Sequence, residues 1–388
     1  MRRINVLMFC VLCVFSNFAT ARISGQPCNC TNEVIDCSNR NKSQVHLEEK
    51  CSNATSGNFE QNSLSDYPDM LKFFTEVSMA SNLLTRLPNI THLNANIMVL
   101  ELSGNMIANS STELQQFSSL QILDVSDNRL GSLEFLPEPC LLVNFTADYN
   151  YIASLQGPLS SCTQLRYLSL NGNEVASIPA NMFAGMADLR ILSLSDNPLG
   201  TLSGDVFRGP LKLNSLFLSA TELTAIPRRL FSGTPELKFL YLSRNRLRDF
   251  PSQPIRELAA LQELSIWGNR ITELPTLSNC CPQLQKVDLD MNEVRAPSEE
   301  AVLSFVRGNA STLLLKNNPL QPHALRWALA SPALQPFVQQ DNCACGGLHL
   351  SHAPLNARAG VRWCVRVPCG PSATHADWIA AVNTSHAL

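Results

Sequence analysis

Residues Leu165 to Val175 read LRYLSLNGNEV, and this stretch is the unit from which the fold can be predicted. Leucines stand at its first, fourth and sixth positions, and an asparagine stands at its ninth. In an extended strand, Leu168 and Leu170 point to one face because side chains alternate. The stretch therefore predicts a short strand with one buried face, which ends where Asn173 turns the chain.

The same pattern, L-x-x-L-x-L-x-x-N-x-L with apolar substitutions, recurs along the chain. Clear copies also begin at Leu120, Leu189, Leu237 and Leu261, and weaker copies begin at Phe74, Ile97, Leu142, Leu213, Leu284 and Ala310. The ninth position falls at Asn82, Asn105, Asn128, Asn150, Asn173, Asn197, Thr221, Asn245, Asn269, Asn292 and Asn318, which makes eleven repeats 22 to 26 residues apart. Such a period indicates a solenoid in which each turn stacks on the next.

Two further columns of residues follow from the period. Buried asparagine side chains can bond backbone groups that each turn leaves open, so the ninth positions predict a ladder along the solenoid. Thr221 interrupts this ladder, and its hydroxyl can replace only part of the amide's bonding. Phe183, Phe207 and Phe231 each lie six residues before the next repeat, and they predict an apolar spine on the outer side.

The motif and its copy number resemble the extracellular leucine-rich-repeat proteins, and the resemblance covers about Phe74 to Leu320. It implies an α/β leucine-rich-repeat solenoid, a horseshoe with a parallel sheet on its concave face and mostly irregular convex loops. A solenoid exposes its core at both ends, so such proteins carry caps. Four cysteines stand beyond each end of the repeats: Cys28, Cys30, Cys37 and Cys51 before them, and Cys343, Cys345, Cys364 and Cys369 after them. The resemblance implies bonds Cys343–Cys364 and Cys345–Cys369.

Four cysteines lie within the repeats. Cys140 and Cys162 stand one repeat apart near matching positions, so a disulfide between adjacent loops is predicted. Cys280 and Cys281 are neighbours in sequence, and both a vicinal disulfide and an intermolecular bond remain open.

The first residues have the features of a secretory signal. Arg2 and Arg3 precede an apolar run, 6–15, and Ala19-Thr20-Ala21 offers small residues for cleavage after Ala21. A short uncleaved anchor is the alternative. No later stretch is apolar for long enough to span a bilayer, so we expect a secreted, extracellular protein without a membrane span. The expected organisation is 1–21 signal peptide, 22–73 N-terminal cap, 74–320 repeats, and 321–388 C-terminal cap and tail.

Glycosylation acceptors support the same route through the cell. Triplets of the type Asn-x-Ser/Thr begin at Asn29, Asn41, Asn53, Asn89, Asn109, Asn144, Asn309 and Asn383. An oxidising compartment also makes disulfides the expected state of the cysteines.

Composition and motifs exclude several function classes. The net charge of −3 provides no basic excess for binding nucleic acid. The nucleotide-binding, metalloprotease and serine-hydrolase motifs are absent from the sequence, so we expect no enzyme and no cofactor. Cys343, Cys345, His349 and His352 could form a tetrahedral zinc site, but Cys364 and Cys369 favour disulfides, so no metal is predicted.

The repeat register places large apolar side chains on the concave side of the sheet. The predicted ligand-binding residues are Tyr149, Tyr167, Phe217, Phe239, Tyr241 and Trp267, with Ile191 among them. Exposed aromatic residues of these types are enriched at binding hot spots. The alternative is that neighbouring aromatics pack on each other across strands.

Acidic residues flank this stripe, with Glu101, Asp124 and Asp148 before it and Asp288 and Asp290 after it. They suit the rim of a protein interface, or equally a solvated polar face. A glycan on Asn144 would shield the early part of the sheet.

The sequence therefore predicts a recognition protein of the adhesion, guidance or innate-immune type, which binds an extracellular protein or glycan through its concave face. The alternative is a structural matrix component or a self-associating homodimer.

Overall fold

The computed structural model of the chain describes residues 28–31, 33–43, 45, 53–89, 91–108, 113–277, 280–307, 312–321, 348–351 and 362–365. The predicted signal peptide, Cys51, the sequons at Asn109, Asn309 and Asn383, and the side chains of the C-terminal cap lie outside these residues. No helix in the described ranges has the length and apolar character needed to cross a bilayer.

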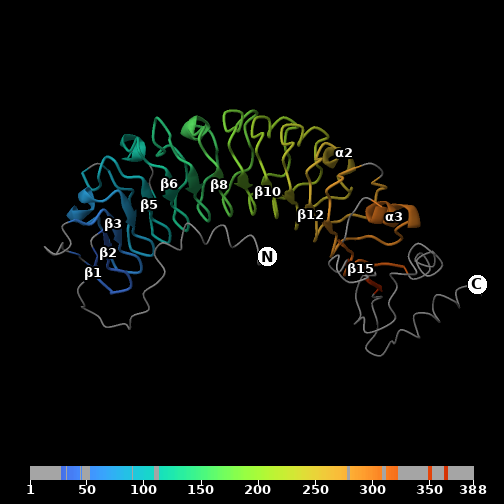
Figure 1. Cartoon of the computed structure of the whole chain (residues 1–388), viewed down its shortest axis with the longest axis horizontal. Coiled ribbons are helices and arrows are strands. Elements are labelled where there is room, and N and C mark those ends of the chain that lie inside the picture. The colour runs from blue at the N-terminus through green and yellow to red at the C-terminus, as the bar shows by residue number, and fades with distance from the viewer. Residues whose placement is uncertain are drawn as a thin grey trace, which may run out of the picture. The chain divides into compact units, whose positions relative to one another are not determined.

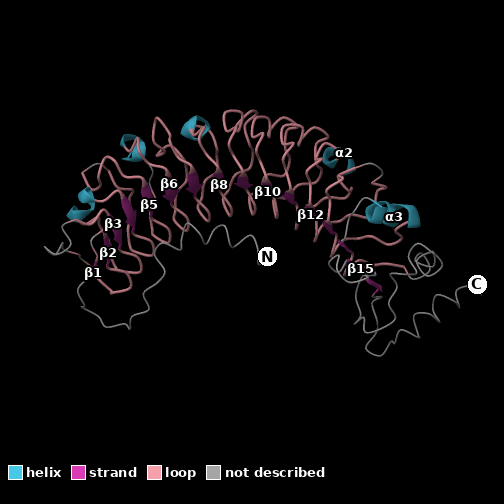
Figure 2. Cartoon of the chain, viewed as in Figure 1, coloured by secondary structure: helices cyan, strands magenta, loops and turns pink. Residues whose placement is uncertain are grey.

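The chain divides into two compact units. Unit 1 comprises Met1–Tyr151 with Gly157–Ser161, and unit 2 comprises Ile152–Gln156 with Cys162–Leu388. In both units the strands follow one another in sequence order, and the helical turns lie on the other side of the coil (Figures 1 and 2). This is the predicted leucine-rich-repeat solenoid.

Unit 1 begins with the antiparallel pair β1 (Asn29–Cys30) and β2 (Val34–Asp36). Its parallel strands continue from β2 through β3 (Ser56–Asn58), β4 (Glu76–Ser78), β5 (Val99–Glu101), β6 (Ile122–Asp124) and β7 (Asn144–Thr146). Its short helical turns are the 3-10 helices η2 (Asp69–Phe73), η3 (Glu113–Gln116) and η4 (Pro158–Ser161). Three-residue strands are expected where only one x-L-x step per turn joins the sheet.

Unit 2 is built from the same repeat, with longer outer segments. Its parallel strands are β8 (Tyr167–Ser169), β9 (Ile191–Ser193), β10 (Ser215–Phe217), β11 (Phe239–Tyr241), β12 (Glu263–Ser265), β13 (Lys286–Asp288) and β14 (Thr312–Leu314). β15 (Leu348–Ser351) and β16 (Arg362–Val365) then add antiparallel strands. Its helices are α2 (Ser252–Ile255) and α3 (Glu299–Arg307).

The core is built from the leucine columns of the repeat. Leu192, Leu216 and Leu240 are register partners on adjacent strands, and all three are fully buried. On the outer side, the rings of Phe183 and Phe207 stack with centroids 5.9 Å apart. Both rings are buried, as is Phe231, which confirms the predicted spine.

The asparagine ladder is present and makes the predicted bonds. At Asn128, Nδ2 donates to the carbonyls of Leu102, Val125 and Ser126 at 2.9, 3.1 and 3.0 Å. Its Oδ1 accepts from the backbone N–H of Ile107 at 3.0 Å. The side chain is 5% exposed, so it satisfies buried backbone groups of two neighbouring turns.

Thr221 performs part of the asparagine's role. Its hydroxyl donates to the carbonyl of Leu218 at 2.8 Å and approaches Oδ1 of Asn245 at 3.0 Å. Where an asparagine oxygen would accept from Leu199, the Leu199 N–H instead donates to the carbonyl of Asn197 at 2.9 Å.

The ladder also reaches one turn earlier than the sequence analysis placed the first repeat. Nδ2 of Asn62 donates to the carbonyls of Cys37, Phe59 and Glu60. This turn has glycine where the other parallel strands have a larger apolar residue, because a Cβ on Gly57 would lie 2.5 Å from the Phe59 ring. The Phe59 side chain thus fills the space of the missing leucine, while the boundary of the cap stays a prediction.

The described cysteines are mostly oxidised. Cys28 bonds to Cys37, and Cys30, Cys140 and Cys162 are also disulfide-bonded. Cys280 and Cys281 bond to each other, which is one of the two alternatives left open by the sequence. The bond between Cys140 and Cys162, and the two pairings in the C-terminal cap, stay predictions.

Candidate functional site

The first and third residues of each strand point away from the core and form the open face of the sheet. In unit 2 this face carries a continuous set of large side chains, which we call the aromatic face. Its members are Tyr167, Ile191, Phe217, Phe239, Tyr241 and Trp267. All six are half-buried, so each packs on its neighbours while keeping part of its surface in solvent.

Strand register brings these residues into two rows. Tyr167 pairs with Ile191 on adjacent strands, and Phe217 pairs with Tyr241. Phe239 is the first residue of β11, and Trp267 stands two residues beyond the end of β12, where alternation returns its side chain to the open face.

The alternative prediction, that aromatic side chains pack on each other across strands, holds for one pair on this face. The rings of Phe217 and Tyr241 are parallel, with centroids 4.7 Å apart and planes 4° apart. Such a stack stabilises the sheet and holds both side chains in fixed rotamers. Within the described residues, the rings of Phe239 and Trp267 have no aromatic partner, so packing between rings does not account for them.

Charged groups border the aromatic face at β12 and β13. Nζ of Lys286 lies 2.7 Å from Oε1 of Glu263 across the two strands. Burial, with the negative charge of Glu263, raises the pKa of Tyr241 to about 12. The phenol therefore remains protonated at neutral pH and can donate a hydrogen bond to a ligand.

The acidic residues after the aromatic face are half-buried. Burial raises the pKa of Asp288 and raises that of Asp290 to about 6. Oδ1 of Asp288 accepts from the N–H of Asp290 at 3.0 Å, and Oδ1 of Asp290 accepts from the N–H of Lys316 at 2.6 Å. Asp290 therefore titrates in the mildly acidic range and is charged at neutral pH.

Tyr149 differs from the other predicted binding residues because it belongs to unit 1. It lies in the turn after β7 with a φ of 52° and is 59% exposed. Tyr151, which sequence reasoning did not select, is 57% exposed just beyond the ladder residue Asn150. The signal that could have identified Tyr151 is its place directly after the ninth position of the repeat, where the chain has already left the core.

The acidic residues predicted to precede the aromatic stripe also lie in unit 1. Glu101 and Asp124 are the third residues of β5 and β6, and Asp148 follows β7.

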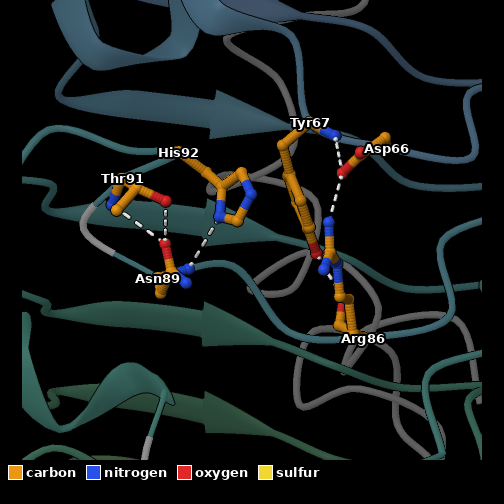
Figure 3. A network of polar contacts seen from close by, with 6 residues as sticks. All are labelled: Asp66, Tyr67, Arg86, Asn89, Thr91 and His92. Carbon is orange, nitrogen blue, oxygen red and sulfur yellow. Dashed lines mark hydrogen bonds and ion pairs between the residues drawn. The ribbon is translucent and has the colours of Figure 1, made fainter.

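The described sequons differ in their surroundings. Asn144 is the first residue of β7 and is half-buried on the open face of unit 1, whereas Asn29, Asn41 and Asn53 are exposed. Figure 3 shows the sequon at Asn89, whose Oδ1 accepts from the backbone N–H and the hydroxyl of Thr91 at 2.9 and 2.5 Å. Its use as an acceptor stays a prediction.

The same view shows what holds this loop (Figure 3). Nδ1 of His92 accepts from the N–H of Asn89 at 3.3 Å, and the His92 ring lies 5.3 Å from the ring of Tyr67. The Tyr67 hydroxyl donates to the carbonyl of Arg86 at 2.8 Å, and Arg86 pairs with Asp66 at 3.1 Å. These contacts join the loop to the turn at Asp66 and Tyr67, so we assign the cluster to the stability of the loop.

Comparison with known families decides the nature of the repeats. The leucine rich repeat family matches residues 148–199, 163–223, 189–247 and 211–271. Residues 148–271 of this chain are therefore leucine-rich repeats. Within the described residues, no group of three or more His, Cys, Asp or Glu side chains is placed to hold a metal ion. The side chains of the alternative zinc set lie outside those residues.

The leucine-rich-repeat chain is similar to longer human proteins over part of its length. It is 29% identical over 175 residues to human leucine-rich repeats and immunoglobulin-like domains protein 3, and 28% identical over 180 residues to human protein 2 of the same name. These alignments cover 43% and 42% of this chain, and 16% of each relative. The chain thus matches about a sixth of the length of these relatives.

Solved structures share the fold at lower identity. Toll from Drosophila, solved in complex with Spatzle, is 20% identical with a TM-score of 0.63, over 76% of this chain and 41% of the other. A structure from the octameric complex of Latrophilin 3, Unc5D and the leucine-rich repeats of FLRT2 is 22% identical with a TM-score of 0.57. That match covers 82% of this chain and 94% of the other, and it supports the solenoid fold.

Proposed function

We propose that this chain is a secreted, extracellular recognition protein that binds a protein ligand through the aromatic face of unit 2. The observation that carries the proposal is a run of large, half-exposed apolar side chains on successive strands, from Tyr167 on β8 to Trp267 after β12. A water-soluble sheet face gains nothing from leaving Phe239 and Trp267 in solvent, whereas a ligand that covers them removes that surface from water.

The chemistry of the face suits a protein more than a small molecule. Tyrosine and tryptophan offer large, rigid contact areas with one hydrogen-bond donor each, and they are the side chains most often found at the centre of protein interfaces. The stacking of Phe217 on Tyr241 fixes two of these side chains before binding, which lowers the entropy lost when a ligand docks. Glu263, Lys286 and the carboxylates of Asp288 and Asp290 form a charged border that selects the partner's orientation.

The fold relatives are compatible with this role. Toll is in complex with Spatzle, and FLRT2 is in complex with Latrophilin 3 and Unc5D. We extend protein recognition from those chains to this one as a proposal, together with its secretion and a role in adhesion, guidance or innate immunity. Binding, and no catalysis, is the proposed activity.

The test is a binding screen of the full secreted chain against a library of extracellular proteins and glycans. A double variant, Tyr241→Glu with Trp267→Glu, runs in parallel with the parent chain. We expect a protein ligand whose affinity falls at least about a hundredfold in the double variant, because two buried charges replace two hot-spot side chains. Thermal unfolding of the variant establishes that the fold is retained.

A matched control introduces the same charges away from the strands. Leu211 and Phe73 are 55% and 63% exposed outside the strands, so Leu211→Glu with Phe73→Glu should leave binding unchanged. A ligand bound equally by both double variants would move the site away from the aromatic face. A glycan as the sole ligand would overturn protein recognition, and self-association without any partner in light scattering would favour the alternative of a structural component or homodimer.

A further inference from the structure

The open face of unit 1 has a chemistry opposite to the aromatic face. Third-position residues of β2, β5 and β6 are Asp36, Glu101 and Asp124, and the first residue of β4 is Glu76. Glu60, two residues beyond β3, turns to the same side, because its Oε1 accepts from the hydroxyl of Ser78 on β4 at 2.7 Å. These five carboxylates on consecutive turns define the acidic face (β3, β5 and β6 mark it in Figure 1).

In the part of the chain that the structure describes, no base neutralises the carboxylates of the acidic face. No lysine or arginine stands at a first or third strand position from β2 to β7. Among the described residues, none of the five carboxylates forms an ion pair, although unit 1 pairs acids and bases elsewhere, as at Asp66 and Arg86. The negative charge of this face is therefore available to a molecule outside the chain.

The carboxylates lie close enough to interact with one another. Glu101 is 9% exposed, and burial together with the charges of Glu60, Asp124 and Glu76 raises its pKa to about 7. Holding like charges together on a half-buried face costs free energy. A bound cation would remove that cost, so the face favours positively charged ligands beyond the simple sum of its charges.

A second, independent feature of this face is a hydroxyl without a partner. Ser56 is the first residue of β3 and lies between Val34 and Glu76 in the strand register. Its side chain is 6% exposed, and its Oγ has no hydrogen-bond partner. Because Gly57 faces the core, strand alternation directs Ser56 to the acidic face. A buried hydroxyl is nearly always bonded in a folded protein, and a ligand donor at this face would satisfy it.

From these observations we propose that the acidic face of unit 1 is a second binding surface, which takes a lysine- or arginine-rich segment of a protein partner. Guanidinium and ammonium groups match the carboxylates in charge and donate to carboxylate and hydroxyl oxygens alike. An extended basic segment suits a row of carboxylates spread over consecutive turns, whereas a single metal ion needs three or more ligands converging on one point. No such group exists among the described residues.

The test uses the full chain and a fluorescein-labelled nona-arginine peptide, with binding followed by fluorescence anisotropy above pH 7 at low ionic strength. The variant Glu76→Gln, Glu101→Gln, Asp124→Asn removes three charges while keeping the side-chain shapes. We expect its affinity for the peptide to fall by at least about tenfold, and the parent's affinity to fall as salt is added.

A control with the same change in net charge separates a site from general attraction. Glu174, Glu236 and Glu257 are exposed acids of unit 2, and their replacement by glutamine should change the affinity less than about twofold. The single variant Glu101→Gln removes one charge without changing the side-chain volume, and its affinity for the peptide should still fall about threefold. This variant serves as the test if the triple variant does not fold.

Three results would overturn the proposal. The first is an absence of peptide binding at low ionic strength, and the second is an equal loss of peptide affinity in both triple variants. The third is tight Ca²⁺ binding in titration calorimetry by a chain that does not bind the peptide. The two faces lie in different units, so the acidic-face variants can be tested whether or not the aromatic face binds a ligand.

Discussion

At the residue scale, Glu101 shows how a surface position can oppose folding. It is nearly buried on β5, and its pKa is raised from 4.5 to about 7 by burial first and by neighbouring carboxylates second. The folded state thus holds a proton that the unfolded chain has released between these two values. Stability falls as pH rises through this window, and the full cost is present above pH 7.

Glu101→Gln should therefore stabilise the chain above pH 7 by about 2 kcal/mol and change little below pH 4.5, since the neutral amide has no charge to desolvate. Urea unfolding at both pH values measures the difference. Glu174→Gln, at an exposed position, provides the control and should change stability by less than about 0.5 kcal/mol at either pH. A gain of the same size at both pH values would contradict the role of ionisation.

Single residues also mark the limit of what the sequence could predict. The ladder residues and the phenylalanine spine follow from spacing alone, because the ladder residues stand at the ninth position of their repeats and the three phenylalanines each stand six residues before a repeat. Asn62 was missed because its turn has Gly57 in place of leucine, and only the packing of Phe59 shows how that space is filled. The raised pKa of Glu101 could not be predicted either, since it depends on which carboxylates three neighbouring turns bring together.

At the element scale, the outer turns of unit 2 pack backbone against backbone. A Cβ on Gly233 would lie 2.4 Å from the carbonyl oxygen of Phe207 and 3.0 Å from the Cα of Arg208. These are main-chain atoms of the preceding turn, which cannot move without displacing the buried Phe207 ring. The spacing of the outer turns is therefore set by a glycine that lets two segments approach.

Gly233→Ala should destabilise the chain by about 2 kcal/mol, because the added methyl group overlaps a fixed carbonyl. Gly204→Ala is the matched control, since its nearest atoms are 3.8 Å away and ordinary contact results. That change should be neutral or stabilise by a few tenths of a kcal/mol through the lower entropy of the unfolded chain. Equal losses in urea unfolding would refute the close approach of the two turns.

The elements themselves were predicted unevenly. The parallel strands follow from the x-L-x-L-x pattern, and the structure has one at each predicted repeat. The positions of α2, α3 and the 3-10 helices were not predicted, because the outer segments carry no shared motif and only need to span a turn. The stacking of Phe217 on Tyr241 was foreseen as an alternative to binding, but which aromatic pair would stack depends on side-chain rotamers.

At the scale of the whole molecule, the chain presents two faces of different chemistry on one repeating scaffold. The leucine and asparagine columns fix the coil, which leaves the open strand positions free to vary. In unit 2 several of these positions are aromatic, and in unit 1 four of them are acidic, at Asp36, Glu76, Glu101 and Asp124. From the sequence, Glu101 and Asp124 were predicted as part of a rim of the aromatic stripe, and Glu60 and Glu76 were not singled out, whereas in the structure these four carboxylates interact with one another.

Asn144 is a predicted glycosylation acceptor that lies beside the acidic face, so the proposed secretion of the chain bears on whether this face is accessible. Asn144 and Thr146 both point to the open face of unit 1, and Asn144 is the register partner of Ile122 on the adjacent strand, whose third residue is Asp124. A glycan is bulky, so one attached at this position would lie over the end of the acidic face. Its presence would limit access to a basic partner without altering the aromatic face of unit 2.

We therefore expect Asn144→Gln, in a chain secreted from glycosylating cells, to lose the mass of one glycan and to bind the nona-arginine peptide about threefold more tightly, because a steric barrier is removed while every carboxylate remains. Asn53→Gln is the control, since Asn53 is exposed in the turn before β3 and is not itself a strand residue of the open face, so its glycan should not affect the peptide. Mass spectrometry and anisotropy on the same samples make the two readouts independent.

An unchanged mass would mean that the acidic face is already open, and a loss of mass without tighter binding would mean that the glycan points away from the face. Either result would separate the charge of the face from its accessibility, which are the two properties that a basic partner requires.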